Sequence, residues 1–433
     1  MKIVLLTPGT GSYYCGVCMR DNALAREAIR QGHDAVMLPM YLPLTLDETS
    51  TNAGAKVFYG GINVYLQQKF AFFRKTPRWL DRLLDYRGFL RLAATRAGMT
   101  GGPEVADITL SMLRGEEGNQ AKELEQLIEW LKEHKPDAVW LSTALLAGLA
   151  RRIVRELQIP VLCSLQGEDV FVDELPQPWS RQCWETLAER SREIVSFIAP
   201  SRFYGELMAR RMQLRPEQVE VVPNGISLEG YETSAKPEEP PVIGYLARFT
   251  EGKGLGLVVD AFIELARRGR FPKTKLRCFG AMTSGDEKYI GGLKKKLAAA
   301  GVLDRVEFHP NVSRETKIEL LRTLTFLSVP AKYGEAFGLY LVEALAAGVP
   351  VAQPRVAAFP EIVEATGGGI LFDAMTAASC ADAWENLLGN PEKVRRLGVA
   401  GREAVFRDYT IERLAARYLE LTQRALAPAP VAA

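Results

Sequence analysis

The feature that most constrains this chain is the alternation of short apolar segments with amphipathic helical segments along its 433 residues. Such alternation is typical of parallel sheets, because each parallel strand needs a long, usually helical, crossover to bring the chain back to the same end of the sheet. A chain of this length is too long for one compact core and suits two domains of roughly 200 residues. The sequence therefore predicts an α/β protein made of two doubly wound, Rossmann-like parallel-sheet domains.

The apolar runs also predict individual elements. In the first half, strands are expected at 2–7, 34–39, 138–142, 161–165 and 194–200, and helices at 20–31, 120–134, 146–157 and 180–192. In the second half, strands are expected at 242–246, 275–280, 306–310, 325–330 and 349–352, with a helix at 255–268.

A polar, proline-containing segment, 232–241, is expected to link the two halves. The predicted domains are an N-terminal acceptor-side domain, 1–222, and a C-terminal donor domain, 223–404. A C-terminal helix, 405–426, is expected to pack back on the first domain. Doubly wound sheets bind ligands at the carboxyl ends of their strands, so the two domains are expected to face each other across a cleft.

Composition excludes several classes of protein. Lys and Arg number 54 against 52 Asp and Glu, which gives a net charge of +2 and no case for a nucleic-acid partner. No apolar run reaches transmembrane length. The short run that begins the chain suits a buried strand better than a signal peptide. Six scattered cysteines do not form a disulfide framework, so a reducing cytoplasm is expected.

The segment 335–350 suggests a binding site. A buried strand leads into a polar loop that contains Glu335, and Gly338 then opens an apolar helix that contains Glu343 and ends at Gly348. An isolated pair of this kind could equally be a solvated loop acid and a helix-surface acid. At the start of a helix, however, two carboxylates and free backbone amides suit a ligand that carries both hydroxyls and an anion. A sugar nucleotide meets both demands.

The turn 248–254 suggests where such an anion would bind. It follows one expected strand, precedes the helix at 255–268, and contains Arg248, Lys253 and two glycines. Two cations and close backbone approach suit a diphosphate, although a basic surface turn would look similar. The spacing is not that of a Walker loop.

Taken in order, Asn224-Gly225-Ile226, the turn 248–254 and the Glu335–Glu343 block resemble the retaining nucleotide-sugar glycosyltransferases of family 4, which have the GT-B fold. Phe308-His309-Pro310 and the segment 406–409 also fit. The resemblance covers nearly the whole chain and is strongest from 194 to 373. It implies two Rossmann-like domains, a nucleoside diphosphate sugar as donor substrate, and no metal or other cofactor.

Residue by residue, the resemblance implies that Arg248 and Lys253 hold the donor diphosphate. Glu343 would bind the ribose hydroxyls and Glu335 would lie at the transferred sugar. Catalysis is assigned to Glu335, Arg248 and Lys253. The remaining donor-binding residues would be Phe337, Gly338 and Leu339 through their amides, together with Gly16, Gln166 and Asn224.

Three places depart from the family pattern, and one of them is Ser227, which stands where an Asp commonly follows Asn-Gly-Ile. Gln166 follows a strand where many relatives have a histidine beside the sugar, and it can still hydrogen-bond a sugar hydroxyl. The first loop contains Cys15 and Cys18 in a spacing known from redox motifs, where relatives have a plainer glycine-rich loop. Gly16 in this loop is the candidate for close backbone approach. Zinc would need two further ligands, so two small loop thiols are the simpler interpretation.

The segment 69–96 combines eight Lys or Arg residues and several aromatic residues with only two acids. Such a segment could lie on an anionic membrane at the inner face and serve a lipid-linked acceptor. It could also be a helical insertion packed on the first domain. The acceptor is therefore expected to be a sugar, a lipid-linked molecule or another small molecule.

The sequence favours a metal-independent, retaining hexosyltransferase. Three alternatives stay open: a GT-B sugar-nucleotide epimerase or hydrolase, a glucan synthase similar to bacterial glycogen synthases, and a non-catalytic sugar-nucleotide or redox sensor. The glucan synthase is suggested by a hairpin expected around Gly60-Gly61. With only three histidines, the chain offers little support for an epimerase or hydrolase that would use a histidine acid or base.

Overall fold

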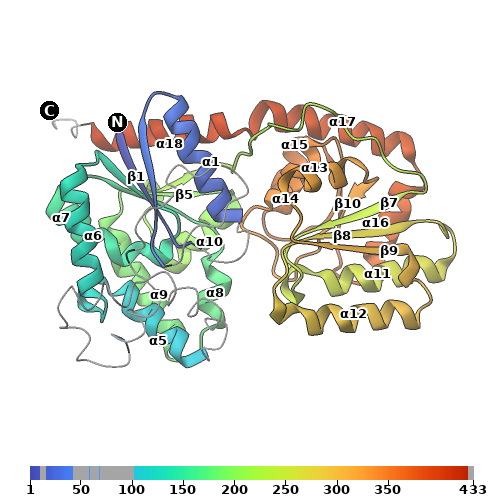
Figure 1. Ribbon diagram of the computed structural model, residues 1–433, viewed down its shortest axis with the longest axis horizontal. Helices are drawn as coiled ribbons and strands as arrows, with labels where there is room; N and C mark the ends of the chain where they lie inside the picture. The colour runs from blue at the N-terminus through green and yellow to red at the C-terminus, as the bar shows by residue number, and fades with distance from the viewer. Residues whose placement is uncertain (10–15, 42–57, 59–67, 69–101, 428–433) are drawn as a thin grey trace. The chain divides into compact units, whose positions relative to one another are not determined.

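The computed structural model describes residues 1–9, 16–41, 58, 68 and 102–427. The chain forms two compact units, one from Met1–Pro223 with Leu414–Ala433 and the other from Asn224–Arg413 (Figure 1). The hairpin expected around Gly60, the thiol of Cys15 and the basic segment 69–96 lie outside the described residues. None of the described helices is long and apolar enough to cross a membrane.

The first unit is built on a sheet whose six described strands are all parallel, in the order β2-β1-β3-β4-β5-β6. They are β1 (Lys2–Thr7), β2 (Asp34–Pro39), β3 (Ala138–Leu141), β4 (Val161–Ser164), β5 (Ser196–Ala199) and β6 (Val219–Val221). The central strands are short and almost wholly buried, as strands covered by helices on both faces must be. The order reverses between β1 and β3, which makes their carboxyl ends the switch point of this sheet.

The helices of the first unit come from the first half of the chain, except for one helix from its C-terminal end. They are α1 (Gly16–Arg30), α5 (Gly102–Leu113), α6 (Ala121–His134), α7 (Ala150–Leu157), α8 (Glu168–Glu174), α9 (Trp179–Arg190), α10 (Arg202–Met212) and α18 (Ile411–Leu426). Helix α18 contributes to the core: Tyr418 packs edge-on against Trp140 with ring centroids 5.3 Å apart, and the Trp140 indole donates to the Thr422 hydroxyl at 2.9 Å.

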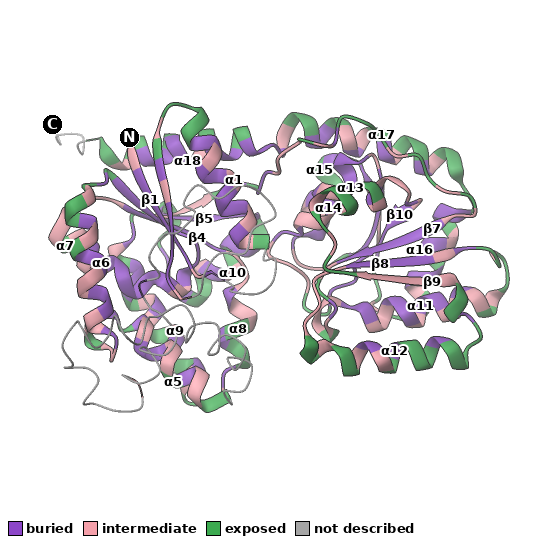
Figure 2. Cartoon of the chain, viewed as in Figure 1, coloured by how far each residue is buried: buried purple, intermediate pink, exposed green. Residues whose placement is uncertain are grey.

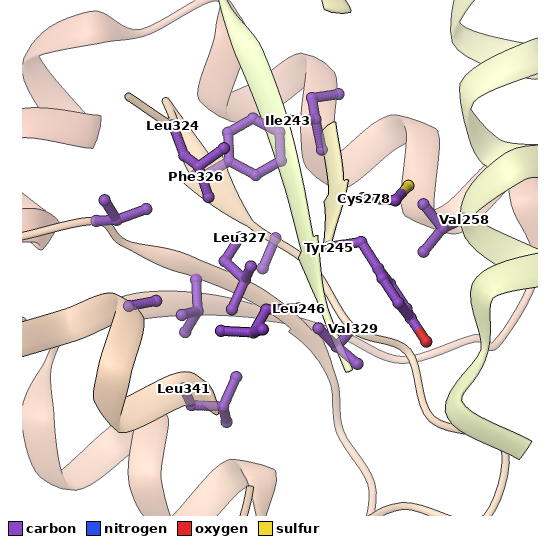
Figure 3. Close-up of a cluster of buried hydrophobic side chains, with 14 of the residues drawn as sticks. Ile243, Tyr245, Leu246, Val258, Cys278, Leu324, Phe326, Leu327, Val329 and Leu341 are labelled. Carbon is purple, nitrogen blue, oxygen red and sulfur yellow. The ribbon is translucent and has the colours of Figure 1, made fainter. Parts of the chain in front are cut away.

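The second unit has its own parallel sheet, with six described strands in the order β12-β11-β10-β7-β8-β9. They are β7 (Val242–Leu246), β8 (Lys275–Gly280), β9 (Val306–Pro310), β10 (Phe326–Leu327), β11 (Val351–Pro354) and β12 (Gly369–Phe372). Read from the other edge, this is the strand order of a dinucleotide-binding Rossmann sheet, with its switch point between β7 and β10. Figure 3 shows the core around these two strands, including Ile243, Phe326 and Leu327.

Helices cover both faces of this second sheet. They are α11 (Leu255–Arg268), α12 (Glu287–Ala299), α13 (Arg314–Arg322), α14 (Leu339–Ala346), α15 (Phe359–Thr366), α16 (Ala377–Leu388) and α17 (Pro391–Asp408). Helices α11 and α12 lie on one side of the strands, and α13, α14 and α15 lie on the other (Figure 1). Burial follows the same plan, since β7 and β8 are largely buried while α12 exposes much of its outer face (Figure 2).

The predicted fold class is confirmed: each unit is a doubly wound parallel sheet. Some details differ from the prediction. The strand expected at 325–330 has ladder hydrogen bonds only over Phe326–Leu327, because the chain turns into the following loop. The helix expected at 405–426 is wrong as one element. Helix α17 ends at Asp408 and α18 begins at Ile411, because Thr410 forms a parallel bridge with Ile226 instead of continuing the helix.

Candidate functional site

The candidate site of the second unit lies where the strand order of its sheet reverses. The loop that follows β7 contains Arg248 and Lys253, and the loop that follows the neighbouring strand β10 contains Glu335. Ligands of open α/β sheets bind beyond the carboxyl ends of the strands at this point, because the chain leaves the two central strands toward opposite faces and a crevice opens between the connections. The topology therefore brings Glu335 beside Lys253, although the two residues are 82 positions apart in the sequence.

Lys253 and Glu335 are in direct contact. The ammonium of Lys253 lies 2.6 Å from Oε1 of Glu335, and the Tyr340 hydroxyl donates to the same oxygen at 3.2 Å. Burial raises the pKa of Tyr340, and the neighbouring Glu335 carboxylate raises it further, so this hydroxyl keeps its proton. The Lys253 side chain is 38 % exposed and that of Glu335 is 16 % exposed. A ligand can therefore reach the cation while the carboxylate is held in place.

The backbones of the two loops are tied together. The amide of Lys332 donates to the carbonyl of Gly252 at 2.9 Å, and the hydroxyl of Tyr245 donates to the carbonyls of Arg248 and Lys253 at 3.1 and 3.2 Å. Tyr245 belongs to β7 and is fully buried; its ring packs in the core while its hydroxyl oxygen points out of the apolar cluster (Figure 3). The core thus fixes the turn that presents Arg248 and Lys253.

The first turn of α14 supplies further donors. Gly338 precedes the helix with a left-handed φ of 104°, a conformation that glycine adopts without strain. Having no side chain, Gly338 cannot cap the amides that follow it, so the helix start offers backbone N–H groups and a partial positive charge to an anion. Phe337 is buried and packs against Tyr409 with ring centroids 6.2 Å apart, which anchors this entry into the helix.

Glu343 lies on the second turn of α14 and pairs with a residue that the sequence did not point to. Lys317 of α13 places its ammonium 2.6 Å from Oε1 of Glu343, and the two side chains are only 14 % and 19 % exposed. The pair holds the Glu343 carboxylate at one position. A carboxylate held in this way can accept hydrogen bonds from two neighbouring hydroxyl groups.

Arg248 is more accessible than the other cations of the site. Its side chain is 42 % exposed, and its guanidinium lies 3.7 Å from a carboxylate oxygen of Asp286. Asp286 is itself held by the amide and hydroxyl of Thr283, at 2.8 and 2.7 Å. Asp286 therefore forms a fixed counter-charge near the guanidinium, which remains partly exposed to solvent.

The other predicted site residues are divided between the two units. Gly16 is exposed as the first residue of α1, and Gln166 lies between β4 and α8 at the carboxyl edge of the first sheet. Asn224 is buried at the start of the second unit. Within the described ranges, no group of three or more His, Cys, Asp or Glu side chains is placed to hold a metal ion. Cys18 is buried, and its sulfur lies 3.8 Å from the hydroxyl oxygen of Thr7.

Two family models match consecutive parts of the chain. The model of glycosyl transferases group 1 matches residues 231–404, and the model of glycosyltransferase family 4 matches residues 99–229. The first covers most of the unit with the Lys253–Glu335 contact, and the second covers about half of the unit with Gln166. The chain belongs to glycosyltransferase family 4.

Named relatives of this family 4 chain match part of its length. A D-inositol 3-phosphate glycosyltransferase of Nocardia farcinica is 28 % identical over 250 residues, which are 55 % of this chain and 54 % of that protein. A phosphatidyl-myo-inositol mannosyltransferase of Mycobacterium leprae is 30 % identical over 208 residues, 46 % of this chain and 53 % of that protein. The family 4 chain thus spans about half the length of the curated relatives that it matches.

Solved structures match the family 4 chain over nearly its full length. A sucrose-phosphate synthase from Thermosynechococcus elongatus has a TM-score of 0.73 at 17 % identity and covers 98 % of both chains. HepE from Anabaena, solved in complex with UDP and glucose, has a TM-score of 0.66 at 14 % identity and covers 98 % of this chain and 99 % of its own. At these identities the likeness shows the fold, which is GT-B.

Replacing Glu343 with alanine is expected to weaken the binding of UDP or GDP to this family 4 glycosyltransferase by about 10- to 100-fold. A hydrogen bond to a charged acceptor contributes roughly 1.5–3 kcal/mol, and the variant removes the acceptor that the family resemblance assigns to the ribose hydroxyls. It also leaves the Lys317 ammonium unpaired at a partly buried position. Titration calorimetry with the free nucleotide measures the change.

The control for this prediction is Glu319→Ala, which removes an exposed carboxylate from α13 and should leave nucleotide affinity unchanged. Glu343→Gln keeps a neutral acceptor and should fall between the two. If Glu343→Ala binds UDP and GDP as the unaltered protein does, Glu343 does not bind ribose.

Proposed function

We propose that this chain transfers a hexosyl group from a nucleoside diphosphate sugar to an acceptor hydroxyl, with retention of the anomeric configuration. The observation that carries the proposal is the contact between Lys253 and Glu335 at the switch point of the second sheet. It places an accessible cation next to a fixed carboxylate, close to the switch point where such a sheet binds its ligand. The cation suits the diphosphate, and the carboxylate suits the hydroxyls of the sugar attached to it.

In the proposed reaction, Arg248, Lys253 and the amides of Phe337, Gly338 and Leu339 bind the diphosphate. The bond between the anomeric carbon and the diphosphate oxygen breaks, and its electron pair goes to the leaving diphosphate. The acceptor oxygen bonds to the anomeric carbon from the same face, and the acceptor proton passes to an oxygen of the leaving group. Negative charge thus grows on the diphosphate, where Lys253 and Arg248 stabilise it.

Glu335 has two roles in this proposal. Its carboxylate accepts hydrogen bonds from hydroxyl groups of the transferred hexose, and through Oε1 it fixes the ammonium of Lys253. Glu343, held by Lys317, binds the ribose of the donor. The two cations supply the positive charge that a divalent ion supplies in other transferases, so the proposed reaction uses no metal and no cofactor beyond the donor substrate.

The comparisons support the choice of substrates. Solved complexes of the structural neighbour HepE contain UDP with glucose, and UDP-glucose, which supports a nucleoside diphosphate hexose as donor. The names of the curated relatives include an inositol phosphate and a phosphatidylinositol as substrates. We therefore place a small polyhydroxyl compound, free or lipid-linked, as the acceptor.

A thermal-shift panel of UDP-, GDP- and ADP-sugars, run in EDTA, tests the proposal. A ligand that binds only the folded protein at 100 times its Kd stabilises it by about 2.7 kcal/mol. We expect one nucleotide series to raise the melting temperature despite the chelator. That donor is then incubated with inositol, inositol phosphate and simple hexoses, and the anomer of the product is read by NMR.

Several outcomes would contradict the proposal. If no nucleotide in the panel stabilises the protein, the proposed donor site is wrong. If stabilisation appears only after magnesium or manganese is restored, the proposal that the reaction needs no metal is wrong. Free hexose or an epimerised donor as the sole product would replace a transferase with a hydrolase or an epimerase.

A further inference from the structure

Glu168 is a buried carboxylate that the proposed reaction does not yet use. It begins α8 at the carboxyl end of β4 in the first unit and is 3 % exposed. Five donors reach it from three connections of the sheet, those that follow β3, β4 and β5. They are the Thr143 hydroxyl at 2.7 Å and the Ala144 amide at 2.9 Å on Oε1, and the Gln166 amide at 2.8 Å, the Gly167 amide at 3.1 Å and the Tyr204 hydroxyl at 2.9 Å on Oε2.

Stability alone does not account for an acid at this position. Removing a carboxylate from water is costly, and hydrogen bonds must offset that cost before the residue contributes anything. What Glu168 provides, and an apolar side chain could not, is a fixed direction for two successive backbone amides, those of Gln166 and Gly167. Gly167 has a φ of 103°, which lets the chain turn so that both amides face the same oxygen.

The side chain of Gln166, which this turn orients, contains an unusual group. Its amide nitrogen Nε2 is shielded from solvent and makes no hydrogen bond to any part of the chain that the structure describes. Leaving a buried donor unsatisfied costs about 1–3 kcal/mol, and most buried polar groups in proteins have partners. The residue as a whole is only partly buried, so the amide lies just beneath the surface at the carboxyl edge of the sheet. This edge is where doubly wound sheets bind ligands.

We infer that Glu168 is a positioning residue that holds Gln166 so that its side-chain amide donates a hydrogen bond to a hydroxyl group of a substrate sugar. The inference rests on the proposed function, because it presumes a sugar substrate. It divides the work between two residues: Gln166 touches the sugar, and Glu168 acts only through the backbone amides of the turn. The roles predict that both residues affect recognition of the sugar, and that neither affects recognition of the nucleotide.

The experiment compares the Kd of free UDP or GDP with that of the corresponding nucleotide sugar, using UDP-glucose, UDP-galactose, UDP-N-acetylglucosamine and GDP-mannose as probes. The sugar contribution is the ratio of the two constants for the probe that binds best. Gln166→Ala and Glu168→Gln should each reduce this contribution by about the factor of ten that one hydrogen bond provides, with the Kd of the nucleotide unchanged. The double variant should lose no more than either single variant, because the two residues act as one unit.

Two further variants separate positioning from folding. Glu156→Gln is the matched control: Glu156 is an acid of α7 in the same unit, paired with Lys132 at 2.7 Å and with Arg152. It should lower the melting temperature without changing the sugar contribution. Tyr204→Phe removes one of the five donors to Glu168 and keeps the inference testable if Glu168→Gln does not fold.

Each outcome decides the question. Additive losses in the double variant, or a Glu168→Gln protein that resembles the Glu156→Gln control, would overturn the positioning role. If the unaltered protein binds each nucleotide sugar no more tightly than the free nucleotide, the role of Gln166 is wrong. If it binds no nucleotide at all, the failure belongs to the proposed function itself.

Discussion

A Lys253→Ala variant is expected to turn over about 10²- to 10³-fold more slowly, while its affinity for the nucleotide sugar falls by less than about tenfold. The diphosphate carries negative charge before the reaction and more of it as the glycosidic bond breaks. A cation beside the leaving group therefore stabilises the transition state more than the bound substrate, and its removal lowers kcat more than it raises KM.

The contact between Lys253 and Glu335 adds a second effect that must be separated from the first. Without the ammonium, the Glu335 carboxylate remains next to the incoming diphosphate and repels it. The double variant Lys253→Ala/Glu335→Gln removes this repulsion, so it should recover part of the substrate affinity lost in Lys253→Ala without recovering turnover. Steady-state kinetics over a range of donor concentrations separates the two.

Lys296→Ala is the control, because Lys296 also pairs with an acid, Asp260, but lies on α12 away from the switch point. Its kinetics should match those of the unaltered protein. If Lys253→Ala changes KM and leaves kcat alone, the lysine binds substrate without stabilising the leaving group, and the proposed role is wrong.

The second large effect is expected from one added methyl group. A Cβ atom on Gly254 would lie 2.0 Å from the carbonyl oxygen of Pro330, and the residue has a left-handed φ of 78°. Both the backbone conformation and the clash oppose any side chain. Gly254→Ala is expected to destabilise the second unit by about 2–4 kcal/mol, within the range of strongly destabilising substitutions. Urea denaturation followed by tryptophan fluorescence measures the loss.

Gly252→Ala in the same turn is the matched control. A Cβ atom on Gly252 meets nothing within 4 Å, and its φ lies outside the left-handed region. This variant should unfold at nearly the urea concentration of the unaltered protein. Pro330 lies in the loop that contains Glu335, so Gly254→Ala should impair turnover even where the protein remains folded. Equal urea midpoints for the two variants would show that the turn relaxes around the added methyl group.

The sequence predicted the sheets well because buried parallel strands are short apolar runs bounded by polar residues. The bounds of β1, β2, β7, β8 and β9 coincide with the prediction, as do those of α11. Strand β12 was not predicted. It begins with Gly369, the last of three consecutive glycines that are more typical of a turn than of a strand, and among the described strands it pairs with β11. Pairing at the edge of the sheet, rather than local preference, makes it a strand.

For the site, the sequence supplied the acids and cations but not their partners. Motif spacing identified Lys253 and Glu335, and the sheet topology explains why residues that far apart meet. Lys317 and Asp286 carry no such signal, because each is an ordinary charged residue on an amphipathic helix or at its start. The role of Glu168 could not be predicted either, because the residues near it in the sequence do not indicate that Thr143 and Tyr204 donate hydrogen bonds to it. Tertiary contacts of this kind cannot be predicted from local sequence patterns.

The discontinuity of the first unit has a consequence for how the chain is made. Its core includes Tyr418 and Thr422, which cover Trp140, and these residues leave the ribosome only after the whole second unit, Asn224–Arg413, has been synthesised. At elongation rates of about 5–20 residues per second this interval is on the order of 10–40 s. During that time Trp140 in the first sheet lacks its contacts with Tyr418 and Thr422. The second unit, although synthesised later, is continuous in sequence and can complete its core first.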